Sequence, residues 1–163
     1  MTDDAGAFWA FSLRVYATSG VESACLDLQD THGLDVNLVL FCCWAGSLGV
    51  AFTKRQMADV AGQSREWQDK VVQPLRTIRR DMKNMVTNDD QKQSLRDLVK
   101  QAELSAEMLQ QHSLAQSLNG KQPDTPGKQV IRVNLQAYAG VAGCDCNIVR
   151  LCEPIIAASL PAG

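Results

Sequence analysis

Cysteine and histidine are the residues of this chain that could supply a nucleophile or a metal ligand, because the thiolate and the imidazole do both. The chain has six cysteines and two histidines. Cys144, Cys146 and Cys152 lie close together, with the spacing C-x-C-x5-C. Zinc sites usually contain a C-x-x-C pair or a histidine nearby in the sequence, and this stretch has neither. The three cysteines are therefore weak candidates for a metal or redox site, and we expect no cofactor.

The adjacent cysteines Cys42 and Cys43 favour packing over chemistry. On a helix their side chains point about 100° apart, so they do not easily share one site. Free cysteine behaves as a small hydrophobic residue and is often buried. We expect all six thiols to be free in a cytoplasmic protein, because Asp3 and Asp4 stand where a secretory signal would carry positive charge.

The histidines are better explained by structure than by catalysis. His32 is expected at the C-terminus of a helix, where an imidazolium interacts favourably with the helix dipole. His112 is expected on the inner side of a long helix, where a polar residue more often sets helix register. A cysteine–histidine nucleophile pair requires the fold to bring the two residue types together.

A basic helix is the clearest candidate for binding. Its cationic side chains are Arg76, Arg79, Arg80 and Lys83. Arginine binds carboxylates and phosphates through two parallel hydrogen bonds, so the cluster is a candidate surface for an acidic protein partner or a phosphate-bearing ligand. Charge reversal at the three arginines is then expected to abolish partner capture and to leave thermal stability nearly unchanged. A solvated charged face is the simpler alternative.

Nucleic acid is a weaker candidate ligand for this cluster. The net charge of the chain is -2, whereas sequence-independent binding depends on many contacts between basic residues and phosphates. No aromatic residues interleave with the cluster to stack on bases.

A second candidate site consists of polar and amphipathic residues in otherwise apolar helices. Its members are Trp9, Tyr16, Asp35, Asn37 and Trp44. Buried Trp and Tyr side chains usually find one hydrogen-bond partner, which Asp35 or Asn37 could provide inside a closed core. Alternatively the helix borders a cavity, and these residues are the few orienting polar groups of a small-molecule pocket.

The least polar stretch of the chain must position these residues. From Leu38 to Trp44 every residue is apolar or a cysteine, so a helix here has no polar face and is expected to be buried. We call it the hub helix, from about Val36 to Ala45. Asp35 is placed to cap its start, and Gly46 and Gly49 to end it. Its apolar run is shorter than the roughly 20 residues of a membrane span, so we expect no membrane segment.

Two long helices follow, and we expect them to form an antiparallel hairpin from about Ser64 to Leu118. A preceding short helix should stop near Gly62, and Ser64 should cap the first long helix, which Pro74 kinks. Its expected contact face has heptad-like spacing: Trp67, Val71, Leu75, Ile78, Met82 and Met85. The second long helix should bury a leucine-rich side that includes Leu95, Leu98 and Leu109.

Residues 119–127 are rich in turn formers and are expected to be a mobile loop. Two C-terminal helices follow, and Pro154 bends or divides the second. A length of 163 residues suits one domain, residues 1–163, and the composition is ordinary for a globular protein. We therefore predict an all-α, single-domain bundle of seven or eight helices around the hub helix.

Three segments near the N-terminus carry a resemblance. They are the Phe-Trp-x-Phe-Ser start at Phe8, the Ala-Cys-Leu-x-Leu-Gln segment at Ala24, and the Gly-x-Asp-Val-Asn-Leu run from Gly33 that leads to Trp44. Together they resemble the signature of an uncharacterised bacterial family, a domain of unknown function in short cytoplasmic helical proteins. The resemblance brings no activity, cofactor or catalytic residue, and it supports the choice of the hub helix and the single domain.

These observations favour a non-enzymatic cytoplasmic interaction protein, an adaptor or regulator, because the chain has a good core, two oppositely charged helices and no convergent catalytic set. The expected partner is another protein, bound through the charged and aromatic faces. The alternative is a small-molecule-binding or enzymatic helical domain with an apolar pocket beside the hub helix. Thiol redox or metal chemistry is a third hypothesis.

Overall fold

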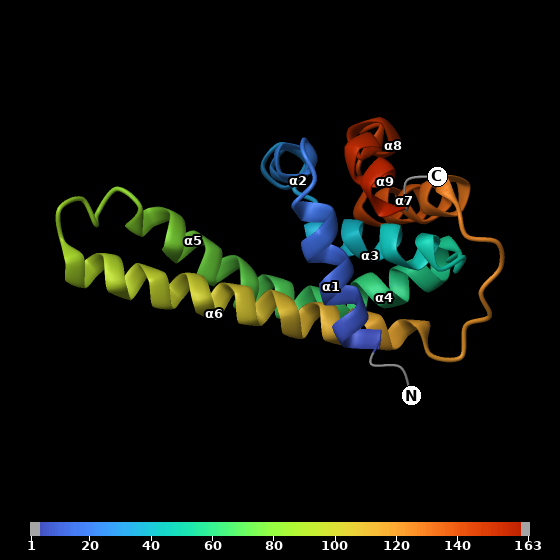
Figure 1. Ribbon diagram of the computed structural model, residues 1–163. Helices are drawn as coiled ribbons and strands as arrows, with labels where there is room; N and C mark the ends of the chain where they lie inside the picture. Colours follow the sequence, from blue (N-terminus) through green and yellow to red (C-terminus); the bar gives the residue numbers. More distant parts are fainter. Residues whose placement is uncertain (1–3, 161–163) are drawn as a thin grey trace.

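The fold is all-α, as the sequence predicts. The computed structural model describes residues 4–160, and within them helices are joined by loops without any strand (Figure 1). The α-helices are α1 (Asp4–Tyr16), α2 (Val21–Asp30), α3 (Val36–Ser47), α4 (Lys54–Trp67), α5 (Gln73–Met82), α6 (Asp90–Ala115), α7 (Lys128–Ala142), α8 (Ile148–Leu151) and α9 (Glu153–Ser159). In this part of the chain no helix combines the length and apolar character that crossing a membrane requires.

Helix α3 is the hub helix, and its burial confirms the prediction. Every residue from Asn37 to Gly46 is buried. Asp35 caps the helix, because its carboxylate accepts a hydrogen bond from the backbone N–H of Asn37 at 2.9 Å. The prediction that Gly46 ends the helix was wrong, because α3 continues to Ser47. Gly46 instead lets α7 pack closely, since a Cβ there would lie 2.6 Å from Ile131. The chain turns instead at Gly49, whose φ of 80° favours glycine.

An aromatic cluster joins α1 to α3. The rings of Phe8 and Trp44 stack with their centroids 4.8 Å apart, and the Phe41 and Phe52 rings meet edge to face at 5.4 Å. Phe8 and Phe41 are fully buried, and Trp44 is 4% exposed. Aromatic pairs in these geometries add to the stability gained from burial, so this cluster anchors the centre of the core.

The short fourth helix does not stop near Gly62, and this prediction was wrong. Helix α4 continues through a π-helical segment, Gln68–Val72, into α5, and the three form one rod. In the segment the backbone N–H of Gln73 donates to the carbonyl of Gln68, five residues back. Proline has no N–H to donate and crowds the preceding turn, and a wider turn beside Pro74 accommodates both effects.

The wide turn changes which residues of the rod face α6. From Ser64 onward the buried residues are Ser64, Gln68, Val72 and Arg76, spaced by four residues. The predicted face is right in part, because the Trp67 indole N–H donates to the Ala106 carbonyl of α6 at 2.9 Å, whereas Ile78 and Met85 are 47% and 65% exposed. Ser64 does not cap a helix; its buried hydroxyl accepts a hydrogen bond from the Gln110 side chain at 2.8 Å.

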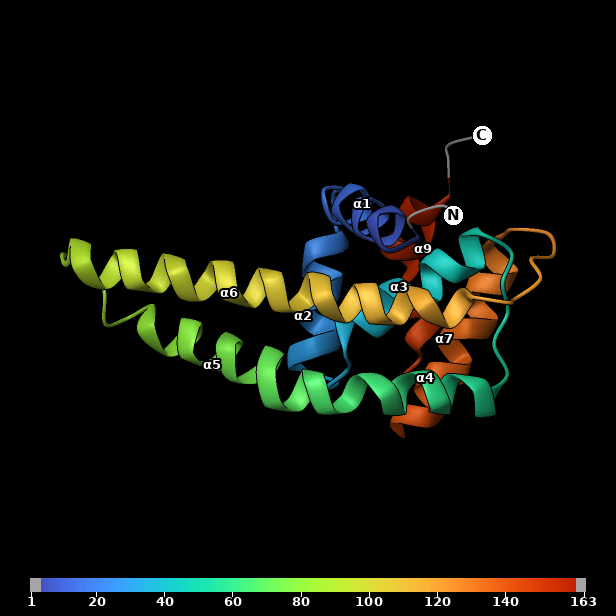
Figure 2. The same ribbon diagram turned by 90° about the horizontal axis from the view of Figure 1, so that it is seen from below.

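The rod and α6 form the predicted antiparallel hairpin, whose far end extends away from the other helices (Figures 1 and 2). The leucine-rich side of α6 is not buried, contrary to prediction: Leu95, Leu98 and Leu109 are 54%, 61% and 54% exposed. The buried side of α6 is half polar and consists of Glu103, Ala106, Gln110, Gln111, Leu114 and Ala115. His112 was predicted on the inner side of the helix, and it is exposed instead.

The C-terminal helices cover the other face of α3. Residues 119–127 are irregular, as predicted, and the backbone N–H of Asp124 donates to the Gly49 carbonyl at 2.9 Å. The expected mobility of this loop stays a prediction. Helices α8 and α9 are separate and Pro154 lies in the first turn of α9, so the last helix is divided as predicted.

Candidate functional site

A cleft of about 860 Å³ lies between the α5–α6 hairpin and the helices α1 and α2. Residues of both predicted sites line it: Trp9, Tyr16 and Asn37 from the aromatic and polar set, and Arg76, Arg79, Arg80 and Lys83 from the basic set. The sequence presents these as two separate sites, and the fold joins them. We call this space the binding cleft.

Two members of the predicted pocket set do not line the binding cleft. Trp44 is buried in the aromatic cluster against Phe8. Asp35 does not face the cleft, and the backbone N–H of Asp35 donates to the Tyr138 hydroxyl at 2.8 Å. Asp35 therefore acts on the cleft only through its neighbours.

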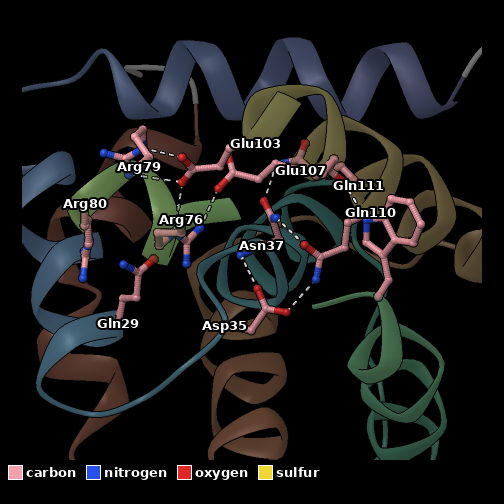
Figure 3. Close-up of polar contacts among 12 residues, drawn as sticks. Gln29, Asp35, Asn37, Arg76, Arg79, Arg80, Glu103, Glu107, Gln110 and Gln111 are labelled. Carbon is pink, nitrogen blue, oxygen red and sulfur yellow. Dashed lines mark hydrogen bonds and ion pairs between the residues drawn. The ribbon is translucent and has the colours of Figure 1, made fainter. Parts of the chain in front are cut away.

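A chain of hydrogen bonds forms the floor of the cleft (Figure 3). The Ser12 hydroxyl donates to Gln111 at 2.9 Å, and the Gln111 amide donates to the Asn37 carbonyl oxygen at 2.9 Å. The Asn37 amide donates to Gln110 at 2.6 Å, and the Gln110 amide donates to the Asp35 carboxylate at 2.7 Å. The chain links α1, α3 and α6, and because each amide is held by two partners it fixes the side chains that face the cleft.

The glutamines of α6 were missed as partners of Asn37 and Asp35. The sequence led us to expect Trp and Tyr side chains in that role, and for Trp44 this was wrong. A signal was present: Glu103, Ala106, Gln110 and Leu114 recur at spacings of three or four residues, which places them on one helix face. The leucines on the neighbouring faces of the helix led us to predict the wrong buried side.

Burial raises the pKa of Asp35 to about 6. The hydrogen bonds from the Asn37 backbone and the Gln110 side chain act in the opposite direction, because they stabilise the carboxylate. Asp35 therefore titrates closer to neutrality than an exposed aspartate does.

Arginines and glutamates form a paired cluster on the hairpin wall of the cleft (Figure 3). Arg76 is 8% exposed and bonds Glu103 at 3.2 Å and Glu107 at 2.5 Å. Arg79 also bonds Glu103. Burial alone would raise the pKa of Glu103, but the two guanidinium groups outweigh it and lower that pKa. Arg76 is thus an internal residue, and we no longer expect its charge reversal to spare stability.

The other basic residues of the cleft are more accessible. Arg80 pairs with Asp30 at 2.9 Å, and both side chains are nearly half exposed. Lys83 and Lys100 are exposed and form no salt bridge with residues 4–160. Exposed ion pairs are weak and exchange readily with solvent, so an incoming anion meets Lys83, Lys100 and Arg80.

Apolar side chains line both walls of the cleft, because Leu13, Tyr16 and Leu26 lie on α1 and α2, whereas Leu104 lies on α6. Leu13, Tyr16, Leu26 and Leu104 are 53%, 39%, 42% and 50% exposed and all border the cleft. Burial raises the pKa of the Tyr16 phenol to about 12, so it is neutral at physiological pH. Cys25 is the thiol among the described lining residues, and burial raises its pKa to about 12 as well. A thiol of that kind is a poor nucleophile.

The predicted cysteine triplet is divided by the fold. Cys152 is fully buried in the core and free, as are Cys42 and Cys43. Cys144 and Cys146 lie in the loop between α7 and α8 and form a disulfide, so the expectation of six free thiols was wrong for these two. The loop brings the Cα atoms of Cys144 and Cys146 to 5.3 Å, and the C-x-C spacing in the sequence did not lead us to predict this pairing.

Comparison with known proteins is informative about the family. The profile of a family described as "Protein of unknown function (DUF2390)" matches residues 7–114. The chain belongs to the DUF2390 family. No curated protein and no solved structure matches the chain. All residues that line the binding cleft fall within the DUF2390 segment, whereas α7, α8 and α9 lie outside it.

Proposed function

We propose that this DUF2390 protein is a non-enzymatic interaction module of the bacterial cytoplasm, and that its binding cleft takes an acidic, amphipathic segment of another protein. One observation carries the proposal: half-exposed apolar side chains and a group of basic side chains line the same open cleft. Amphipathic helices of partner proteins bind grooves with such apolar walls.

Charge supports an acidic occupant. Six basic side chains line the cleft, on α5, directly after it and on the first half of α6: Arg76, Arg79, Arg80, Lys83, Arg96 and Lys100. Three carboxylates line it too, and two of them, Glu103 and Glu107, are already engaged by arginines. The local charge is therefore positive although the net charge of the chain is -2. Complementary charge raises the association rate and selects the orientation of the partner.

The apolar side chains of the cleft support a protein segment as the occupant. Leu13, Leu26 and Leu104 are each at least 42% exposed, and several such side chains together typically mark an interaction surface. The hydrogen-bonded floor is rigid, and a rigid site loses less conformational entropy when it binds. The four buried, free cysteines fit a reducing compartment, and the cytoplasmic location we propose requires the Cys144–Cys146 pair to be a dithiol there.

Affinity capture with matched charge variants tests the proposal. Lys83→Glu/Lys100→Glu reverses two exposed charges inside the cleft, and Arg55→Glu/Lys128→Glu reverses two exposed charges outside it. We expect the first pair to reduce recovery of the specific partner at least tenfold and the second to retain it. Cross-linking should then map the contact to an acidic, leucine-bearing segment of that partner.

The control removes the effect of net charge, because both double variants change it by the same amount. Equal capture by the wild-type chain and by both variants would refute the cleft as the binding surface. A thermal melt of each variant shows whether the fold is intact, since neither pair touches the buried arginine cluster.

A small-molecule ligand is the second candidate, and the cavity volume favours it. About 860 Å³ lies within the range of ligand pockets. Native mass spectrometry of freshly purified protein distinguishes the two. A bound ligand mass that is lost in Lys83→Glu/Lys100→Glu would show that the cleft binds an anionic small molecule and not a protein segment.

A further inference from the structure

A histidine distant in sequence meets the two loop cysteines. The ligand atoms of His32, Cys144 and Cys146 all lie within 4.8 Å of one another, and all three residues are half-buried. His32 follows α2, and the cysteines lie between α7 and α8. One imidazole and two thiols are a ligand set that soft or borderline metal ions prefer.

The backbone holds both cysteines in place. Gly143 follows the end of α7 in the left-handed conformation, and the N–H of the next residue, Cys144, donates to the Ala139 carbonyl at 3.0 Å. The N–H of Ile148, which is 3% exposed, donates to the Cys146 carbonyl at 2.9 Å. The loop is therefore fixed at both ends, and its geometry does not depend on the disulfide alone.

Two further contacts suit metal binding. The Cys146 N–H donates to the Cys144 sulfur at 3.3 Å, and such a bond stabilises a thiolate. An oxygen of Asp27 also lies 3.9 Å from Nε2 of His32, and Thr31 donates to the other Asp27 oxygen at 2.8 Å. Ligand histidines usually have a carboxylate or carbonyl nearby that orients the ring, and Asp27 is the carboxylate near this one.

We propose that reduced Cys144 and Cys146, together with His32, bind one Zn²⁺ ion, and that the disulfide is the oxidised, metal-free form of the same site. A dithiol reductant transfers two electrons and two protons to the disulfide, which gives two thiols and the oxidised reductant. Zn²⁺ then displaces the two thiol protons and takes the imidazole as its third protein ligand. A water molecule or another external ligand completes the tetrahedron.

The site is separate from the binding cleft, because none of its three ligands lines that cleft. It is half-buried, so an ion reaches it from solvent without unfolding of the core. Metal binding here joins the end of α2 to the α7–α8 loop, which are 112 residues apart in sequence. The inference therefore does not rest on the proposed function.

Titration of the full-length chain with Co²⁺ and Zn²⁺ tests the proposal. The chain is reduced, freed of reductant under anaerobic conditions, and titrated with Co²⁺ while thiolate-to-cobalt absorption is followed. We expect one equivalent to bind with that absorption and Zn²⁺ to displace it. The same chain with the disulfide intact is the first control and should show no thiolate–cobalt absorption.

Matched variants identify the ligands. Cys146→Ser should abolish the thiolate–cobalt spectrum or change it to that of a single thiolate, and His32→Ala should weaken affinity at least about tenfold. His112→Ala removes the other, exposed histidine and should change nothing. No binding by the reduced wild-type chain, or an unchanged spectrum in Cys146→Ser, would overturn the proposal. Alkylation of the reduced chain to six modified cysteines verifies that both ligand thiols were available.

Discussion

Helices α3 and α6 both contribute to the core of this fold, yet they bury different kinds of side chain. Helix α3 is buried all round from Asn37 to Gly46, and Asn37 is the polar residue in that stretch. Helix α6 buries one glutamate and two glutamines beside two alanines and one leucine, and its other leucines are at least 50% exposed. The first is held mainly by the hydrophobic effect, which has no preferred direction. The second is held in addition by hydrogen bonds and ion pairs, which require particular partners.

The difference explains where the binding cleft forms. A helix that is apolar all round is covered on all sides and leaves no accessible face. Helix α6 is covered on only one side, and its polar buried stripe supplies the floor and wall of the cleft. The stable core and the binding surface are thus built by different interactions, and each can be disrupted separately.

The largest expected effect comes from truncating the core of α3. Phe41→Ala removes a fully buried ring that contacts the Phe8 and Phe52 rings at centroid distances of 6.0 and 5.4 Å. We expect the free energy of unfolding to fall by about 3–5 kcal/mol. Urea denaturation followed by circular dichroism measures this. A loss below about 1 kcal/mol would contradict the central position of α3.

A slightly smaller effect is expected from the ion-pair cluster of α6. Glu103→Ala removes the carboxylate that pairs with the partly buried Arg79 and leaves the buried Arg76 with Glu107 alone, which should cost about 3 kcal/mol. Glu66→Ala is the control, because Glu66 forms an exposed pair with Lys70 on the same rod and should change stability by less than about 1 kcal/mol. An equal loss of unfolding free energy in both variants would mean that the buried ion pairs of Glu103 stabilise the fold no more than an exposed pair does.

The Asp35 carboxylate accepts hydrogen bonds from both α3 and α6, and it should make the stability of the fold depend on pH. Its pKa of about 6 in the folded chain exceeds the value of about 4 in an unfolded chain, so the folded chain holds the proton more tightly. The stabilisation is complete below about pH 4 and is lost as the pH rises through about 6. We expect wild-type stability to fall by about 2 kcal/mol across this window relative to Asp35→Asn, which does not titrate.

Denaturation midpoints of both chains at intervals from pH 4 to pH 7.5 measure that difference. Parallel curves for the wild-type chain and Asp35→Asn would show that Asp35 titrates in its ordinary range. A constant offset between the curves reports the altered hydrogen bond to Gln110 and not the titration.

The smallest effect is expected on the outer side of α6. Leu98 is 61% exposed, so Leu98→Gln should change the free energy of unfolding by no more than about 0.5 kcal/mol. The same measurement as for Phe41→Ala checks it. A loss above about 1.5 kcal/mol would show that the leucines of α6 are covered in solution, by a second copy of the chain or by another part of it.

The sequence predicted the hub helix well because its signals are local. An unbroken apolar run and the capping position of Asp35 are readable within a dozen residues, and the structure places both as predicted. The family membership was also predicted, from short segments between Phe8 and Trp44. The hairpin was predicted in outline but not in its facing residues, because the π-helical turn lies between two stretches of ordinary helix and no single residue type specifies it.

The candidate sites were harder to predict because they depend on contacts between distant segments. Asn37 and Gln110 are 73 residues apart, and both residue types are mostly found on surfaces, so the sequence does not indicate that these two are buried. His32 and the cysteines of the α7–α8 loop are further apart still. Spacing rules for metal sites count neighbours along the chain, so they cannot detect a ligand that the fold supplies from another helix.

The π-helical segment has a consequence for how relatives of this chain should be aligned. It adds one residue to the rod between Ser64 and Arg76 without rotating the arginine away from α6. A relative with one residue fewer there would reach the same arrangement through ordinary α-helical winding. A single-residue gap at that point would therefore mark a difference in helix winding between two chains whose binding clefts are alike.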